Sequence, residues 1–395
     1  MTGFPEGFIW GTATAAHQVE GGNWNNDWWA WEHTPGSGCV EPSGDACDQY
    51  HRYREDIATI AGLGLNAYRF SVEWSRIEPE AGLWSNAALD HYRRVCDVCR
   101  DHGLIPMVTF HHFTTPRWLA HIGGWEQPDT ADRFAEFCAR TVERLGDVLG
   151  SAATFNEPNV VAMFGYQVGV FPPGRRDRAL RRAVTDVQLD AHHKAAAALR
   201  AGPGSFPVGL TLAMTDYQAV DGGEERVARY RAAMEDPWLE AARADDYLGV
   251  QTYSRARIGP DSAVGPEPGA AVTQMGYENY PLAVANCVRR AAAAVGAGIP
   301  LVVTENGIAT DDDAVRINFV RDALAGLLSC LADGVDLRGY VYWSLLDNFE
   351  WSLGYGPTFG LVSVDRVTQR RTVKPSAEWL GTIARANALP PPLPS

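Results

Sequence analysis

Short runs of apolar and β-branched residues alternate along this chain with longer stretches whose apolar residues recur at helical spacing. The strand-type runs, several of them almost wholly apolar, cover residues 8–16, 66–72, 104–110, 152–155, 208–214, 247–253, 300–304 and 338–343. Helical stretches lie between them, at 50–62, 87–102, 129–148, 178–201, 224–243, 281–297 and 315–332. Strands that are apolar throughout are typical of a parallel sheet whose two faces are both covered.

This alternation predicts an α/β protein, a single (β/α)8 TIM barrel with its active site at the C-terminal ends of the strands. A doubly wound open sheet is the alternative, but the chain contains no G-x-G-x-x-G motif to support it. No linker or abrupt change of composition divides the sequence. We therefore expect one catalytic domain over residues 1–388 and a Pro-rich, extended C-terminal tail over residues 389–395.

The composition argues against several classes of partner. Lys and Arg number 34 against 48 Asp and Glu, a formal net charge of −14, whereas proteins that bind nucleic acids or anionic membranes are usually basic. The only lysines are Lys194 and Lys374, and no Gly-Lys-Ser/Thr phosphate-binding motif exists. We expect no nucleic-acid partner and no membrane partner.

Further features of the sequence bear on its location. The N-terminal residues show no basic segment followed by an apolar one, so we expect no secretory signal. No apolar run approaches the roughly 18 residues that span a bilayer. Seven cysteines, an odd number without a dense framework, favour free thiols and a cytoplasmic location. Cys96 and Cys99 form a lone C-x-x-C that lacks the second half of a zinc site.

Two glutamates follow apolar runs at the strand ends that a barrel would bring together. Glu157 follows the run at 152–155, and Glu305 follows the run at 300–304. Burial there raises the pKa of a carboxyl group, whereas a neighbouring cation, for which Arg69 is the candidate, lowers it. Glycoside hydrolysis requires two such carboxyl groups with pKa values pushed apart, one to donate a proton and one to attack or to activate water.

The 13 tryptophans suit a sugar ligand, because an indole face stacks against the C–H face of a sugar ring. Trp343 and Trp351 lie in the same segment as amide and acid groups that would meet the sugar hydroxyls. The histidines include two adjacent pairs, whose side chains diverge on a strand and do not share a helix face, and no H-E-x-x-H motif occurs. We expect neither a metal nor another cofactor.

At these residues the sequence resembles the family 1 glycoside hydrolases, typified by β-glucosidases. The resemblance extends over nearly the whole chain and is carried by three motifs. They are Thr-Phe-Asn-Glu-Pro at 154–158, Val-Thr-Glu-Asn-Gly at 303–307 and Trp-Ser-Leu-Leu-Asp-Asn-Phe-Glu-Trp at 343–351. The resemblance implies a (β/α)8 barrel, in agreement with the eight strand-type runs.

The resemblance also implies a role for each matching residue. Glu305 is the implied nucleophile and Glu157 the general acid and then general base, while Arg69 and Tyr253 hold the nucleophile. The implied sugar contacts are Gln18, His112, Asn156, Trp343, Glu350, Trp351 and Phe359. The implied mechanism is a retaining double displacement, for which the two carboxyl groups lie about 5–5.5 Å apart.

Some positions depart from the family pattern. Gln251 and Thr252 stand where many members have Asn and Tyr, and Pro357-Thr358 replaces a common basic pair. The chain is also shorter than many relatives, mostly in the loops after the sixth and seventh runs. We therefore expect a more open or altered aglycone site.

Two residues select among the branches of the family. Glu350 would repel a phosphate dianion, which argues against 6-phosphosugars as substrates. Glu157 stands where plant thioglucosidases have Gln, which favours O-glycosides.

Together these features predict a retaining, exo-acting β-glycosidase that takes a neutral β-glycoside. A β-glucosidase is the first expectation, with β-galactosides or β-fucosides as further substrates. A transglycosylating enzyme is an alternative, because an alcohol other than water can capture the same covalent intermediate. A non-catalytic sugar-binding barrel and a metal-dependent barrel hydrolase are the remaining alternatives. The sequence leaves the natural aglycone, the sugar preference and the oligomeric state open.

Overall fold

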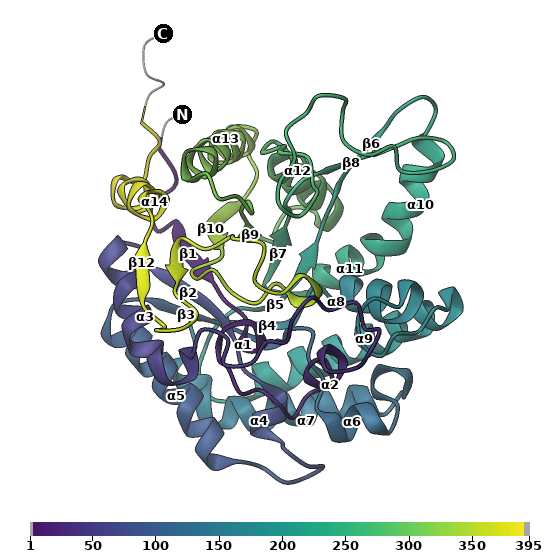
Figure 1. The fold of residues 1–395 in the computed structure, drawn as a ribbon, viewed down its shortest axis with the longest axis vertical. Helices are drawn as coiled ribbons and strands as arrows, with labels where there is room; N and C mark the ends of the chain where they lie inside the picture. Colours follow the sequence, from purple (N-terminus) through teal and green to yellow (C-terminus); the bar gives the residue numbers. More distant parts are fainter. Residues whose placement is uncertain (1–2, 391–395) are drawn as a thin grey trace.

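The eight strand-type runs form a closed parallel barrel in the computed structural model, which describes residues 3–390 (Figure 1). Its strands are β1 (Ile9–Ala13), β2 (Ala67–Ser71), β3 (Ile105–His111), β4 (Ser151–Asn156), β5 (Val208–Ala213), β7 (Tyr247–Gln251), β9 (Leu301–Asn306) and β10 (Leu337–Trp343). Strands consecutive around the barrel are consecutive along the chain, and β10 pairs with β1 to close it. The predicted (β/α)8 barrel is confirmed.

The strands are apolar because both of their faces are buried. Side chains along a barrel strand alternate between the interior and the surrounding helices, so few positions reach water. Leu210 of β5, Leu248 of β7 and Val303 of β9 have no exposed surface. This explains why the strands read as apolar runs rather than as an alternation of apolar and polar residues.

Helices cover the outside of the barrel (Figure 1). The main ones are α3 (Gln49–Leu63), α5 (Asn86–Asp101), α7 (Thr130–Leu145), α9 (Arg178–Ala201), α12 (Ala283–Val295), α13 (Asp313–Ala332) and α14 (Pro375–Ala386). The prediction of one helix over 224–243 was wrong, because the segment forms α10 (Glu224–Met234) and α11 (Asp236–Ala241). Pro237 lies in the first turn of α11. Proline is tolerated there because backbone N–H groups in the first turn of a helix have no acceptor within the helix.

Short elements complete the chain, and the sequence pattern did not predict them. The short α-helices are α1 (Ala16–Val19), α2 (Asp27–Glu32), α4 (Trp74–Ile77), α6 (Arg117–His121) and α8 (Pro158–Val161). The 3-10 helices are η1 (Gly124–Glu126), η2 (Gly146–Val148), η4 (Ala242–Ala244) and η5 (Trp351–Leu353), and η3 (Ala162–Val168) is a π-helix. Two small sheets pair β6 (Asp216–Ala219) with β8 (Arg255–Ile258), and β11 (Val362–Val364) with β12 (Arg371–Val373).

The two ends of the described chain lie side by side (Figure 1). The Phe4 amide donates a hydrogen bond to the Asn387 carbonyl at 2.9 Å, and Trp10 Nε1 donates to Asn387 Oδ1 at 2.9 Å. Leu389 is buried and Pro390 is exposed, while residues 391–395 of the predicted tail lie outside the described residues. Residues 1–388 as one catalytic domain stay a prediction.

The cysteines are free thiols, as predicted, and all but Cys39 are buried. Cys96 and Cys99 both lie within α5, where they are part of the hydrophobic core. Between residues 3 and 390, no helix has the length and hydropathy that crossing a membrane requires.

Shortening a core residue of the barrel tests this packing. We expect Leu210→Ala to lower the free energy of unfolding by about 2–5 kcal/mol, because the truncated side chain leaves a cavity between strand and helices. Leu83→Ala is the control, since Leu83 is 59% exposed, and it should change stability by less than about 0.5 kcal/mol. Urea unfolding followed by tryptophan fluorescence measures both, and equal effects would contradict the assignment of Leu210 to the core.

Candidate active site

The predicted catalytic residues and the residues that hold the nucleophile come from four strands of the barrel, at or toward their C-terminal ends. Arg69 belongs to β2 and Glu305 to β9, while Glu157 directly follows β4 and Tyr253 follows β7 by two positions. The barrel therefore brings together residues that are separated by up to 236 positions in the sequence.

Glu305 is buried and fully engaged by its neighbours. Arg69 donates from Nη1 to Glu305 Oε1 at 2.6 Å, and the Tyr253 hydroxyl donates to Oε2 at 2.5 Å. Both Arg69 and Glu305 are almost completely shielded from water. The two contacts fix both carboxylate oxygens, so the orientation of this carboxylate is set before any ligand arrives.

Asn156 is the centre of a second set of hydrogen bonds. Its Oδ1 accepts from Arg69 Nη2 at 2.5 Å, from Gln251 Nε2 at 2.9 Å and from Thr211 Oγ1 at 3.3 Å. Because Oδ1 is occupied in this way, the amide group can turn only its Nδ2 toward a ligand. Nδ2 is buried and has no hydrogen-bond partner in the described structure.

Two members of this network were not predicted as site residues. Thr211, on β5, also receives a 3.2 Å hydrogen bond from Arg69 Nη2. The sequence signal for Thr211 was a single polar residue within the apolar run at 208–214. Gln251 was noted only as a departure from the family pattern, yet its amide orients Asn156.

Glu157 adopts an unusual backbone conformation at the turn between β4 and α8. Its φ angle is 46°, in the left-handed region that few non-glycine residues adopt. Its N–H donates to the Thr211 carbonyl at 2.8 Å, and Pro158 starts α8 immediately afterwards. Within the described residues, no hydrogen bond to its side chain raises or lowers the pKa of the Glu157 carboxyl group.

The environments of the two glutamates separate their pKa values. Burial raises the pKa of Glu157 well above its ordinary value, and the negative charge of Glu305 raises it further. Burial also raises the pKa of Glu305, but the charge of Arg69 and hydrogen bonds from Tyr253, Arg69 and Gln251 oppose that effect. Glu305 is therefore the stronger acid, and Glu157 is the carboxyl group that keeps its proton.

A third carboxyl group, Glu350, shares this buried environment. Burial raises the pKa of Glu350 to about 8, and the charge of Glu305 adds to the effect. Gln18 donates from Nε2 to Glu350 Oε2 at 3.4 Å and to the Phe349 carbonyl at 2.8 Å. Oε1 of Gln18 is buried and has no hydrogen-bond partner among residues 3–390, so it is available to a ligand hydroxyl.

Aromatic rings form another wall of the site. His112 stacks on Trp343 with ring centroids 5.9 Å apart and on Trp351 with centroids 6.1 Å apart. Burial and the charge of Arg69 lower the pKa of His112 well below its usual value, so its imidazole is neutral. Phe359 contacts Tyr253 edge-on at 5.7 Å and shares a buried cluster with Trp343.

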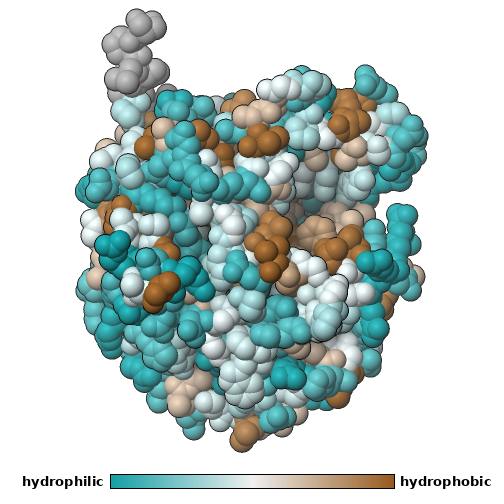
Figure 2. Space-filling view, in the orientation of Figure 1, coloured by the Kyte–Doolittle hydropathy of each residue, from teal (hydrophilic) through white to brown (hydrophobic). Residues whose placement is uncertain are grey.

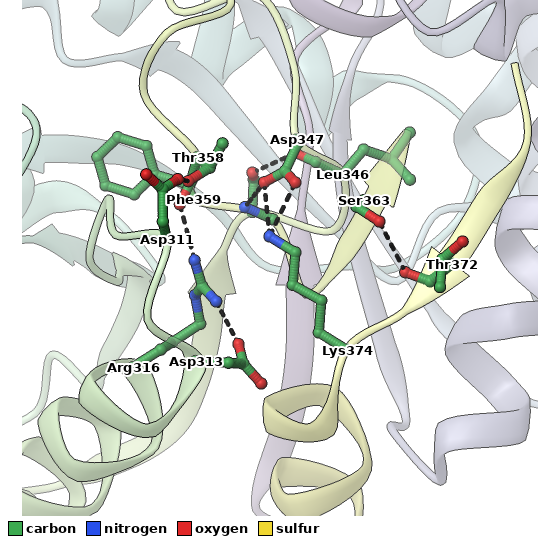
Figure 3. A network of polar contacts seen from close by, with 12 residues as sticks. Asp311, Asp313, Arg316, Leu346, Asp347, Thr358, Phe359, Ser363, Thr372 and Lys374 are labelled. Atoms are coloured by element: carbon green, nitrogen blue, oxygen red, sulfur yellow. Dashed lines mark hydrogen bonds and ion pairs between the residues drawn. The ribbon is translucent and has the colours of Figure 1, made fainter. Parts of the chain in front are cut away.

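The segment that carries Trp343, Glu350, Trp351 and Phe359 is anchored by cations outside the site (Figure 3). Lys374 Nζ lies 2.9 Å from Asp347 Oδ1, which also accepts the Gly360 N–H at 2.8 Å. Arg316 donates from Nη2 to the Thr358 carbonyl at 2.8 Å. One of the two lysines thus fixes the segment that forms one wall of the site.

The structure connects all the predicted site residues. Asn156 contacts Arg69, and Tyr253 contacts Glu305. Gln18 and Trp343 contact Glu350. The aromatic contacts add the remaining side chains, which are His112, Trp351 and Phe359. Glu157 joins them through its electrostatic coupling to Glu305 and Glu350. Among residues 3–390, no group of three or more His, Cys, Asp or Glu side chains is placed to hold a metal ion.

Comparison with known proteins identifies the family. The sequence profile of glycosyl hydrolase family 1 matches residues 1–247 and 242–389. The chain belongs to glycosyl hydrolase family 1. This family 1 protein is a glycoside hydrolase, and the expected resemblance is confirmed.

Individual relatives agree with this assignment. The chain is 34% identical to β-glucosidase A of Thermotoga maritima over 98% of each protein, and 32% identical to a bifunctional β-D-glucosidase/β-D-fucosidase of Bifidobacterium breve over 95% of this chain and 97% of that protein. The crystal structure of the β-glycosidase BGL167 is 49% identical, with a TM-score of 0.91 over 99% of this chain and 100% of that one. The alignment with the Thermotoga enzyme spans 440 positions, so that relative has segments that this 395-residue hydrolase lacks.

Removing the charge of Glu305 tests the electrostatic coupling in this hydrolase. We expect Glu305→Gln to lower the pKa of Glu157, because the negative charge that disfavours its ionisation is gone. Difference infrared spectroscopy of the carboxyl stretch across a pH titration measures the change. Glu225→Gln is the control, since Glu225 is exposed on α10, and an equal pKa in all three proteins would contradict the coupling.

Proposed function

We propose that this family 1 hydrolase is a retaining, exo-acting β-glycosidase, and first of all a β-glucosidase. The observation that carries the proposal is the asymmetry of the two buried glutamates. Arg69 and Tyr253 hold both oxygens of Glu305, whereas no such hydrogen bonds stabilise the ionised form of Glu157. One carboxyl group is thereby prepared to attack and the other to donate a proton.

In the first step Glu305 attacks the anomeric carbon while Glu157 protonates the glycosidic oxygen. The bond between the anomeric carbon and that oxygen breaks, the aglycone leaves as an alcohol, and the sugar becomes an ester of Glu305. The raised pKa of Glu157 keeps the required proton on its carboxyl group. The ion pair with Arg69 keeps Glu305 in the form that can attack.

The second step reverses the part played by Glu157. Esterification removes the negative charge of Glu305, which is one cause of the raised Glu157 pKa. Glu157 then ionises more readily and can take a proton from the water that attacks the anomeric carbon, while the bond between that carbon and Glu305 breaks and the Glu305 carboxylate is restored. Two inversions at that carbon leave the β configuration of the sugar unchanged.

The other site residues supply contacts to the sugar. The unpartnered Asn156 Nδ2 donates to the 2-hydroxyl, and His112 contacts the side of the 3-hydroxyl. Gln18 and Glu350 bind the hydroxyls on the far side of the ring, and Gln18 has a free Oε1 for this purpose. The remaining contacts come from Trp343 as the stacking platform, Trp351 as a hydroxyl contact and Phe359 near position 6.

The β-glucosidase assignment also draws on the relatives. The Thermotoga protein is a β-glucosidase, and the Bifidobacterium protein is both a β-glucosidase and a β-fucosidase. A neutral β-glucoside is thus the proposed substrate, with β-fucosides and β-galactosides as further substrates. The segments missing relative to the longer Thermotoga protein favour an aglycone site of different shape.

Kinetics of two variants test the catalytic roles. We expect Glu305→Gln to lower kcat for an aryl β-glucoside by about 10⁴-fold or more, because no covalent ester can form. Glu157→Ala should lose about 10²–10⁴-fold with a poor leaving group, and azide should partly restore turnover when the leaving group is good. Glu225→Gln is the matched control for loss of one carboxylate. Unchanged turnover in both catalytic variants would contradict the proposal.

The stereochemistry of the product tests the retaining mechanism separately. We expect the first sugar released from an aryl β-glucoside to be the β-anomer, with the α-anomer growing only at the rate of mutarotation. Proton NMR of the anomeric signal during the first minutes of the reaction distinguishes the two. If the α-anomer is released first, the enzyme is inverting and Glu305 is not the nucleophile.

A further inference from the structure

A cavity lies outside the residues of the candidate active site. Its volume is about 240 Å³, and it lies between the start of α9, the π-helix η3 and one face of α10. α10 lies at the periphery of the molecule, and the outline of the surface is indented at the edge where α10 lies (Figure 1, Figure 2). The lining residues are Met163, Gln167, Arg178, Arg181, Arg226, Arg229, Tyr230, Ala233 and Met234.

The spacing of these residues places a polar face of α10 toward the interior of the cavity. Arg226, Arg229, Tyr230 and Ala233 are spaced by three, four and seven positions and so share one side of the helix. A helix side that faces its neighbours is usually apolar. Here it carries two guanidinium groups, so the hydrophobic effect does not explain its composition.

The positive charge of the cavity is not neutralised from within. Four arginines line it and no Asp or Glu does, in a chain whose formal net charge is −14. Arg229 pairs with Glu225 of its own helix. Within residues 3–390, the other three, Arg178, Arg181 and Arg226, have no carboxylate oxygen within 4.0 Å.

Arg181 is the least favourable of these charges. It is only 5% exposed, and its one side-chain hydrogen bond runs from Nη1 to the Ala233 carbonyl at 2.9 Å. A guanidinium has five N–H donors, and only Nη1 donates to a protein acceptor among the described residues. Burial lowers the pKa of Arg181, and the charges of Arg182 and Arg178 lower it further, while Asp186 only partly opposes them. A bound anion would relieve both deficits.

We propose that this cavity binds a phosphate or sulfate group, either as the free ion or carried by a small molecule. Tetrahedral oxyanions accept paired hydrogen bonds from guanidinium groups, which is the main reason that arginine predominates in phosphate sites. The N-terminus of α9 is not the source of the attraction, because Asp177 already caps the Ala179 and Leu180 amides. Tyr230, which stacks on Tyr217 at 5.5 Å, adds an aromatic wall for the carrier of such a group.

Calorimetric titration tests the proposal on the intact protein. The probes are inorganic phosphate and phenyl phosphate, each titrated against sodium chloride at matched ionic strength. We expect the double variant R178Q/R229Q to weaken phosphate binding at least tenfold, because two exposed guanidinium groups of the cavity are lost. The matched control is R243Q/R338Q, which removes the same charge from exposed positions outside the cavity and should change the affinity less than twofold.

The two probes also separate the two sources of the anion. Equal affinities indicate the free ion, whereas tighter binding of phenyl phosphate that is lost in Tyr230→Leu indicates a phosphate monoester. The proposal would be overturned if the wild type bound neither probe at concentrations up to about 50 mM, which corresponds to a very weak dissociation constant. Equal weakening in both double variants would overturn it too, because it would reveal only a response to net charge. Thermal unfolding and hydrolysis of an aryl β-glucoside verify that each variant is folded.

Discussion

The site of this hydrolase depends on one buried cation. Arg69 is almost completely shielded from water, and it contacts Glu305, Asn156 and Thr211 at once. A buried guanidinium is costly unless it is hydrogen-bonded and its charge is balanced, and here both terminal nitrogens donate to three oxygen acceptors, one of which is the Glu305 carboxylate. Removing Glu305 would leave an unbalanced charge in the centre of the barrel, and removing Asn156 or Thr211 would leave a buried donor without its acceptor.

The same cation determines how protons are distributed among three carboxyl groups. Glu157, Glu305 and Glu350 all have raised pKa values because all are buried together. One guanidinium cannot stabilise three negative charges in so small a volume, so protons remain on the groups that it contacts least. Arg69 hydrogen-bonds only to Glu305 among them, and this selects the carboxylate that stays ionised. The different roles proposed for Glu157 and Glu305 thus depend on the position of Arg69.

The arginine-lined cavity beside α10 presents the opposite situation. In the catalytic site one cation serves several acids, whereas in the cavity several cations lack an acid. In both places, side chains of one sign of charge outnumber their partners, and both therefore have unsatisfied capacity for a ligand. The candidate active site offers amide and carboxyl groups, which suit the proposed neutral sugar, while the cavity offers guanidinium groups, which suit the proposed anion.

The alternation of apolar runs and helical stretches was sufficient to predict the barrel, since local periodicity encodes strands and helices directly. The strand ends were sufficient to select Glu157, Glu305 and Arg69, because a barrel places all its C-terminal strand ends on one face. The break between α10 and α11, the network joining Thr211 and Gln251 to Asn156, and the arginine cavity were decided only by the tertiary structure. These features depend on contacts between side chains of different barrel strands, and between helices about 50 residues apart in sequence. The local sequence pattern does not indicate such long-range contacts.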